Sequence, residues 1–251
     1  MEMLYGGAAV RHSVKMRFWK PAILAAAVLM LAVVAGMATV IQNIPDLDQM
    51  LSRPAGPAAS TRLAVHLSDL PPYVAKALLS AEDRNFYGNF GVEPLSMLRA
   101  LYADIRAGRI VEGGSTISEQ LAKNLLPPQR SPIIQKIREI VVALMLEHRF
   151  SKDRILELYL NRVYFGAGAY GIDTAAHRYF GKPARQLTLY EAAMLVGLLP
   201  APSVMNPRHN ASLARQRART VLQDMVSTGF LTPQQRRGVV AAAAEKPPTA
   251  P

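Results

Sequence analysis

Residues 151–182 read SKDRILELYLNRVYFGAGAYGIDTAAHRYFGK, and this stretch is the clearest guide to the fold. Ser151 is a preferred helix N-cap, and Asp153 places a negative charge in the first turn, where the helix dipole favours it. The loop FGAGAYG then interrupts the pattern, and a short helix, IDTAAHRYF, runs to Gly181. The stretch therefore predicts two helices separated by a glycine-containing loop.

Helical patterns continue on both sides of this stretch. Helices are predicted over 69–83, 93–108, 116–124, 132–150, 187–202, 212–229 and 232–245. In the helix over 132–150, an apolar stripe is expected on Ile137, Val141 and Leu144. Outside residues 61–65, no run of four or more residues is convincing as a strand. The predicted fold class is therefore mainly α.

Composition limits the class of protein. The 251 residues suffice for one medium domain and a short appendage, and a hydrophobic content of 50% is too high for a disordered chain. The 29 Lys and Arg against 18 Asp and Glu give a formal net charge of +11, which suggests an anionic partner such as nucleic acid, a membrane surface or a phosphate-bearing substrate. Cysteine is absent, which excludes disulfides and thiolate metal sites.

The segment from residue 21 to residue 41 carries no charge and has the length of a membrane-spanning helix. Basic residues precede it, at Arg11, Lys15, Arg17 and Lys20, and the first acid after it is Asp46. The positive-inside rule then places the N-terminus in the cytoplasm and everything after Asn43 outside. Gly36 and Ala38 would also fit a signal-peptide cleavage site, but the run is long for one, so an uncleaved anchor is favoured.

The chain is therefore predicted to divide into five parts. These are a cytoplasmic basic tail (1–20), a transmembrane anchor (21–41), a linker (42–66), a catalytic domain (67–240) and a disordered tail (241–251).

Two adjacent carboxylates, Glu82 and Asp83, end an apolar helix in LLSAEDRNFYGNFG, residues 78–91. A helix C-terminus disfavours negative charge by about 0.3–1 kcal/mol, so an ordinary helix end gives no reason to place two acids there. Apolar neighbours would raise the pKa of one carboxyl and suit it to general acid or base work. The pair by itself fits either a solvated helix end or a catalytic site.

Residues 113–124, GGSTISEQLAKN, begin a helix with two glycines. Thr116 and Glu119 have the spacing of a capping box, and free amides at such a helix start attract anions. Lys123 is expected on the face that carries Glu119 and Gln120. The segment alone also fits an ordinary capped helix with a solvated lysine, and it lacks the Gly-Lys-Ser/Thr of a P-loop.

A third group, Lys136, Arg138 and Glu139, lies in QKIREIVVALMLEHRF, where a lone acid among bases is more often a surface ion pair. His148 has no second ligand at metal-binding spacing. No Ser/His/Asp triad and no dinucleotide fingerprint is present.

Together, these segments resemble the peptidoglycan glycosyltransferase domain, glycosyltransferase family 51, of monofunctional transglycosylases and class A penicillin-binding proteins. Glu82, Asp83, Phe86 and Gly91 meet its pattern E-D-x-x-F-x-x-H-x-G, and residues 113–124 meet G-G-S-T-I-x-x-Q-L-x-K-N in full. QKIRE retains the Lys and Glu of R-K-x-x-E, and residues 151–182 and 187–207 are similar to the later motifs. The resemblance covers roughly 67–235. Because no Ser-x-x-Lys transpeptidase signature follows, a monofunctional enzyme is expected, unless the chain is a fragment.

The resemblance implies a lysozyme-like helical fold at the outer leaflet and polymerisation of lipid II with inversion, releasing undecaprenyl diphosphate. It implies Glu82 as general base and Glu139 as a second acid that assists the pyrophosphate or its divalent cation, magnesium or manganese. The implied substrate-binding residues are Asp83, Phe86, Ser115, Thr116, Gln120, Lys123 and Lys136. The implied partners are lipid II, the growing glycan strand, membrane lipid and a cell-wall synthesis or division complex, not nucleic acid.

The chain departs from the family pattern at three positions. Asn89 replaces a usual histidine, Gln135 an arginine and Glu119 a glutamine. Losing the arginine lowers the positive field at the pyrophosphate, by about 1–3 kcal/mol of charge-assisted bonding. A weak or inactive lipid II-binding paralogue with a scaffold role is therefore kept as an alternative. A hydrolase or lytic transglycosylase acting on finished glycan is a third reading, which the anion-binding helix start and Lys123 disfavour.

Overall fold

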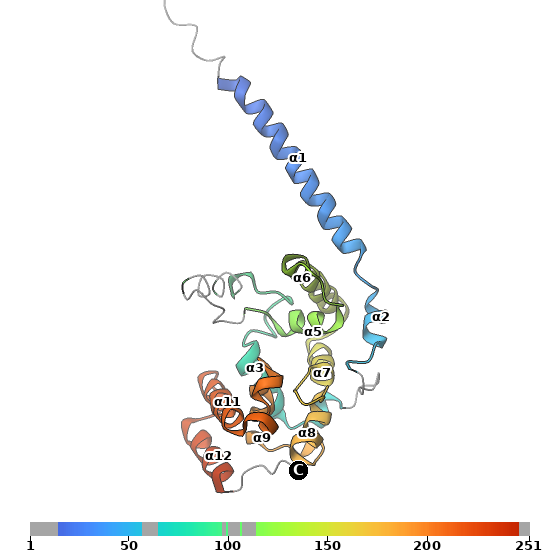
Figure 1. Cartoon of the computed structure of the whole chain (residues 1–251). Coiled ribbons are helices and arrows are strands. Elements are labelled where there is room, and N and C mark those ends of the chain that lie inside the picture. Colours follow the sequence, from blue (N-terminus) through green and yellow to red (C-terminus); the bar gives the residue numbers. More distant parts are fainter. Residues whose placement is uncertain (1–14, 57–64, 97–98, 100–105, 107–113, 246–251) are drawn as a thin grey trace, which may run out of the picture. The chain divides into compact units, whose positions relative to one another are not determined.

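The computed structural model describes residues 15–56, 65–96, 99, 106 and 114–245 (Figure 1). The chain divides into two compact units, residues 1–44 and 45–251. The first described element is α1 (Lys15–Gln42), a helix of 28 residues that contains the predicted anchor segment. In the part of the chain that is described, no helix is long and apolar enough to cross a membrane. The basic tail up to residue 14, residues 57–64 and residues 246–251 lie outside the described part.

The second unit is built from helices, as predicted. They are α2 (Leu47–Ser52), η1 (Leu67–Asp69), α3 (Pro72–Glu82), α5 (Ile117–Leu125), α6 (Pro132–Arg149), α7 (Lys152–Arg162), α8 (Ile172–Phe180), η2 (Ala184–Gln186), α9 (Leu189–Leu198), α10 (Pro202–Met205), α11 (Pro207–Ser227) and α12 (Pro233–Glu245). Among the described residues the sole β-type pairing is an isolated bridge between Tyr164 and Tyr170. The helix predicted over 93–108 and the strand considered at 61–65 fall mostly outside the described residues.

Side-chain caps set the helix starts that the sequence predicts. Ser151 accepts a hydrogen bond from the Arg154 amide at the start of α7. Thr116 and Thr188 each form a capping box with the glutamate three residues on, which begins α5 and α9. These short polar patterns fix local structure because each satisfies backbone amides that have no partner within the helix.

Two groups of helices share the core (Figure 1). Helix α9 is largely apolar and is buried from Tyr190 to Leu198, and it packs against both α3 and α11. In the other group α5 packs against α6 and α7, and α8 connects α7 to α9. The predicted linker 42–66 contains α2, whose Leu47 and Met50 are buried. Hydrogen bonds from Ile117 and Gln120 join α5 to the C-terminal end of α3.

Helix α6 does not bury the stripe that periodicity suggests. Its buried residues are Arg138, Glu139, Val142, Ala143 and Leu146, whereas Leu144 is 44% exposed. Ile137 and Val141 are only partly buried, so the expected stripe lies beside the buried face, and Leu144 is wrongly included in it. The buried face combines the apolar Val142, Ala143 and Leu146 with the charged Arg138 and Glu139.

Candidate active site

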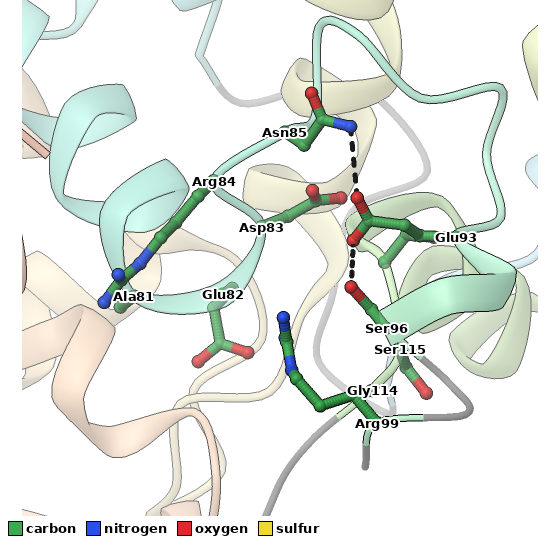
Figure 2. A pocket seen from close by; sticks show the side chains of 11 residues that line it. Ala81, Glu82, Asp83, Arg84, Asn85, Glu93, Ser96, Arg99, Gly114 and Ser115 are labelled. Atoms are coloured by element: carbon green, nitrogen blue, oxygen red, sulfur yellow. Dashed lines mark hydrogen bonds between the residues drawn. The ribbon is translucent and has the colours of Figure 1, made fainter.

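The two adjacent acids at the end of α3 have different surroundings. Glu82 is the last residue of the helix and is half-buried, and Asp83, the C-cap, is buried with 6% of its surface exposed. Both line a cavity of about 670 Å³, shown in Figure 2. The pair is therefore not a solvated helix end.

Glu82 is held through one of its two carboxylate oxygens. Gln120 Nε2 donates to Glu82 Oε2 at 2.9 Å, and Tyr159 Oη donates to Gln120 Oε1 at 2.7 Å. Burial raises the pKa of Glu82, and the charge of Asp83 adds to that, while the Gln120 hydrogen bond and the positive charge of Arg217 oppose it. Such an environment favours a carboxyl that can exchange a proton nearer to neutral pH.

Asp83 joins the end of α3 to the start of α5. Its Oδ2 accepts from the Ile117 amide at 3.1 Å, and Asn89 Nδ2 donates to both of its carboxylate oxygens. Burial raises the pKa of Asp83, and the hydrogen bonds from these two donors oppose the rise. The Glu119 amide is also engaged, by Thr116 Oγ1 at 3.1 Å. Two amides of the predicted anion site are thus satisfied by the chain itself.

Asn89 connects Asp83 to a lysine on α7. Its Oδ1 accepts from the Gly91 amide and from Lys152 Nζ, both at 3.0 Å. Lys152 also pairs with Glu147 at 2.8 Å and lies 4.6 Å from the centre of the Phe86 ring. Phe86 is thus buried beneath this network rather than lining the cavity.

Gly91 has a positive φ of +88°, and an added Cβ would lie 2.5 Å from Glu147 Cγ. Its carbonyl oxygen accepts from Thr116 Oγ1 at 2.6 Å. This glycine lets the loop after α3 approach both α5 and α6, because a side chain there would be strained and would clash.

A second polar cluster surrounds Lys136, beside the first. Its Nζ lies 2.9 Å from Glu119 Oε1, 2.9 Å from Ser115 Oγ and 3.8 Å from Glu139 Oε2. Gln135 Nε2 donates to Glu139 Oε1 at 3.0 Å. The structure therefore joins Ser115, Lys136 and Glu139, and it adds Glu119, a fully buried acid that neutralises part of the lysine charge.

Lys123 does not join this cluster. It is exposed on α5 whereas Glu119 is buried, and no hydrogen bond or ion pair links it to another described residue. A helix turns by about 400° over four residues, so Lys123 lies only about 40° around α5 from Glu119. The two side chains lie on adjoining parts of the helix surface, where Glu119 is buried and Lys123 is exposed.

Several residues at the site were not predicted from the sequence. Arg84, Asn85, Glu93, Ser96 and Arg99 line the cavity together with Ala81, Glu82, Asp83, Gly114, Ser115 and Thr116. In Figure 2 the Glu82 carboxylate and the Arg99 guanidinium both point into the cavity. The Glu93 carboxylate accepts hydrogen bonds from Asn85 and Ser96. Lys152 and Tyr159, seven residues apart on α7, also went unassigned, although that spacing places them on one helix face.

Metal-ligand clusters are not found among the described residues: nowhere do three His, Cys, Asp or Glu side chains gather to hold an ion. Glu139 is a single carboxylate beside a lysine. It fits a divalent cation only as one ligand among several that another molecule would supply.

Comparisons with known proteins show which family the chain resembles. The family model described as Transglycosylase matches residues 48–226. The chain is 45% identical over 174 residues to penicillin-binding protein 1A of Aquifex aeolicus, covering 69% of this chain and 24% of that protein. It is 43% identical to penicillin-binding protein 1A of Escherichia coli, covering 69% and 20%. The chain thus spans about a fifth to a quarter of these relatives.

A solved structure, penicillin-binding protein 1A from Haemophilus influenzae, aligns with a TM-score of 0.43 at 23% identity, covering 76% of this chain and 18% of that one. The family assignment rests on the sequence matches, since the matched residues 48–226 make up most of the chain and include both polar clusters. The chain belongs to the transglycosylase family.

Proposed function

We propose that the chain is a peptidoglycan glycosyltransferase that polymerises lipid II into glycan strands during cell-wall biogenesis. The observation that carries the proposal is the setting of Glu82: a half-buried carboxylate with a raised pKa, anchored through one oxygen, on the wall of a cavity large enough for sugar units. The helical fold and the family membership support a lysozyme-like architecture for the catalytic domain.

In the proposed reaction Glu82 is the general base. It takes the proton from the acceptor sugar hydroxyl as that oxygen attacks the anomeric carbon of the donor from the face opposite the leaving group. The new C–O bond forms while the bond from the anomeric carbon to the diphosphate oxygen breaks, so the configuration inverts and undecaprenyl diphosphate departs. A raised pKa suits this step because a general base works best when its pKa is near the operating pH.

The leaving diphosphate needs positive charge and hydrogen-bond donors. Ser115, which lines the cavity with Glu82, and Lys136, which donates to Ser115, would supply them, and exposed Lys123 would add charge from the solvent side of α5. Gln120 and Thr116 would line the donor side, while Asp83 and Phe86 would hold the loop that carries Glu82. Glu139 would orient Lys136 and the diphosphate.

A divalent cation, magnesium or manganese, would be held by Glu139 and by the diphosphate oxygens of the substrate. Magnesium is usually bound in this way, through one or two carboxylates and substrate phosphates. When bound, it would neutralise charge that develops on the leaving group.

Residues 21–41 are proposed to anchor the chain in the cytoplasmic membrane as a single span, with the catalytic domain on the outer side. The uncharged run and the basic residues before it support this topology. Lipid II, the growing strand and membrane lipid are then the proposed partners, and a cell-wall synthesis or division complex is a further one.

Gel analysis of labelled lipid II tests the proposal. The unaltered chain should produce a ladder of glycan strands, and Glu82→Gln should abolish it while the protein stays folded. Glu191→Gln is the matched control, since Glu191 is a buried glutamate that caps α9. If Glu82→Gln forms as much glycan polymer as the unaltered chain, the proposed role of Glu82 is contradicted.

The ion pair between Glu119 and Lys136 favours a second candidate function, a lipid II-binding scaffold with weak or no turnover. A buried acid at 2.9 Å withdraws part of the positive charge from the diphosphate side. This candidate predicts lipid II binding by the unaltered chain without polymer, whereas the first predicts both.

A further inference from the structure

A chain of two hydrogen bonds runs from the core to Glu82. Tyr159 on α7 is fully buried and donates to Gln120 Oε1 at 2.7 Å, and Gln120 on α5 donates through Nε2 to Glu82 Oε2 at 2.9 Å. Three helices thus meet through three side chains.

The direction of these bonds is fixed by chemistry. An ionised carboxylate can only accept, so the amide nitrogen of Gln120 must face Glu82 and its oxygen must face Tyr159. Tyr159 must then donate, and it keeps its proton because burial, together with the charge of Glu82, raises its pKa well above 10.0. Without Tyr159 the Gln120 amide would be oriented only by its hydrogen bond to Glu82 and would be held less firmly.

We propose that Tyr159 is a positioning residue for the reaction, acting through Gln120 to hold one oxygen of Glu82 and leave Oε1 to face the acceptor hydroxyl. This inference rests on the proposed role of Glu82 as base. Tyr159 itself does not line the cavity and touches no substrate. Its part is to keep the Gln120 amide from turning over.

The charged groups near Glu82 matter for the pH test. Arg217 on α11 favours the ionised carboxylate, and Asp83, next in the chain, disfavours it. Arg84 and Glu93 line the same cavity, and Arg99 points into it. Replacing Tyr159 by phenylalanine leaves all of these charges in place, so a change in the pH profile reports the hydrogen-bond chain rather than the electrostatic surroundings.

The test is Tyr159→Phe, assayed with labelled lipid II in detergent over a range of pH. We expect kcat to fall about tenfold with KM changed less than about twofold, because a small loss of catalytic alignment is costly. The acid limb of the kcat/KM profile should move to higher pH, since a Gln120 amide that is held less firmly favours the charged form of Glu82 less. The matched control is Tyr179→Phe, which removes an equally buried hydroxyl that donates to the Phe165 carbonyl at 2.9 Å. It should leave both quantities unchanged.

The route through Gln120 has its own test. In a Gln120→Ala background, adding Tyr159→Phe should change kcat by less than about twofold, because the relay is already gone. The same tenfold loss in both backgrounds would overturn the route, and a Tyr159→Phe profile equal to that of Tyr179→Phe would overturn the proposal. If Glu82→Gln remains active, the proposed role of Glu82 as base fails, whereas an unaltered chain that forms no polymer would contradict the proposed function itself.

A measurement on the unaltered chain keeps the proposal testable even if Tyr159→Phe folds poorly. The side-chain amide protons of Gln120 should exchange slowly with water, and the NMR signal of the proton that faces Glu82 should shift as Glu82 titrates. Exchange as fast as that of a solvent-exposed glutamine, with no shift over the Glu82 titration, would show that the amide is not held, and the proposal would be lost.

Discussion

Asn89 Nδ2 lies 3.1 Å from one carboxylate oxygen of Asp83 and 3.2 Å from the other, so that a single amide spans the buried acid. The oxygen of the same amide accepts from Lys152 Nζ. A neutral side chain thus separates a buried carboxylate from a buried ammonium and satisfies both. The amide therefore has a structural task at a position where the family usually has histidine, and nothing in its contacts requires a titrating group.

Asn89→Ala should destabilise the domain by about 1–3 kcal/mol, because Asp83 loses its side-chain donor and Lys152 an acceptor. Urea denaturation measures the loss, and kcat should fall with it because the loop that carries Glu82 loses its support. Asn206→Ala is the control: Asn206 is also buried, donates to two carbonyls and caps α11. It should lower stability while kcat of the folded fraction holds. Asn89→His, which keeps a donor, should retain more activity than Asn89→Ala, and equal activity of the two would contradict this account.

Glu82→Gln should stabilise the folded chain at neutral pH. Burial raises the pKa of Glu82 in the folded state above its ordinary value of 4.5, so the ionised form costs stability above that raised pKa. Glutamine removes the cost. As pH falls through the folded pKa the difference between the two chains should shrink, and it should vanish below the unfolded value.

Thermal unfolding at several pH values measures this effect. A gain on the order of 1 kcal/mol corresponds to about 2–4 °C in Tm for a domain of this size. A Tm difference that stays constant on both sides of the pKa would show that the substitution acts through packing and not through charge.

Helix starts could be predicted from the sequence where a side chain caps its own helix. The starts of α5, α7 and α9 were predictable because Thr116, Ser151 and Thr188 cap their own helices, and such caps need no tertiary partner. No local rule predicts the hydrogen bond between Glu82 and Gln120, which lies 38 residues later in the chain. Only the family motif assigned both residues to one site.

Two of the missed side chains act only through other residues. Lys152 and Tyr159 support the acid pair through Asn89 and Gln120, so neither touches the cavity, and a side chain that acts through another carries no local signal. Arg138 and Glu139 on α6 were taken for a surface pair because apolar periodicity cannot detect a buried polar face.

Lys152→Met should cost about 3 kcal/mol of unfolding free energy. The lysine pairs with Glu147 where the two side chains are 18% and 12% exposed, and removing one partner leaves an uncompensated buried charge. The control is Arg149→Met, which breaks a pair with Asp48 whose side chains are 46% and 66% exposed. Such a surface pair is worth at most about 1 kcal/mol. Equal losses in the two variants would show that burial does not set the cost of the Lys152 substitution.

Glu119→Gln should raise kcat/KM for lipid II. Glu119 holds Lys136 Nζ at 2.9 Å in the core, and the neutral glutamine would free the lysine charge for the diphosphate while its side-chain oxygen still accepts from the Thr116 amide. A charge-assisted hydrogen bond is worth about 1.5–3 kcal/mol, so a three- to tenfold rise in kcat/KM is a conservative expectation, and most of it should appear as a lower KM. The matched control is Glu191→Gln, because Glu191 occupies the same capping position on α9 and pairs with Lys182 at 2.7 Å. An increase in both variants would point to a general effect of the lost charge, whereas an increase confined to Glu119→Gln would identify the Glu119–Lys136 pair as the feature that restrains the diphosphate side of the site.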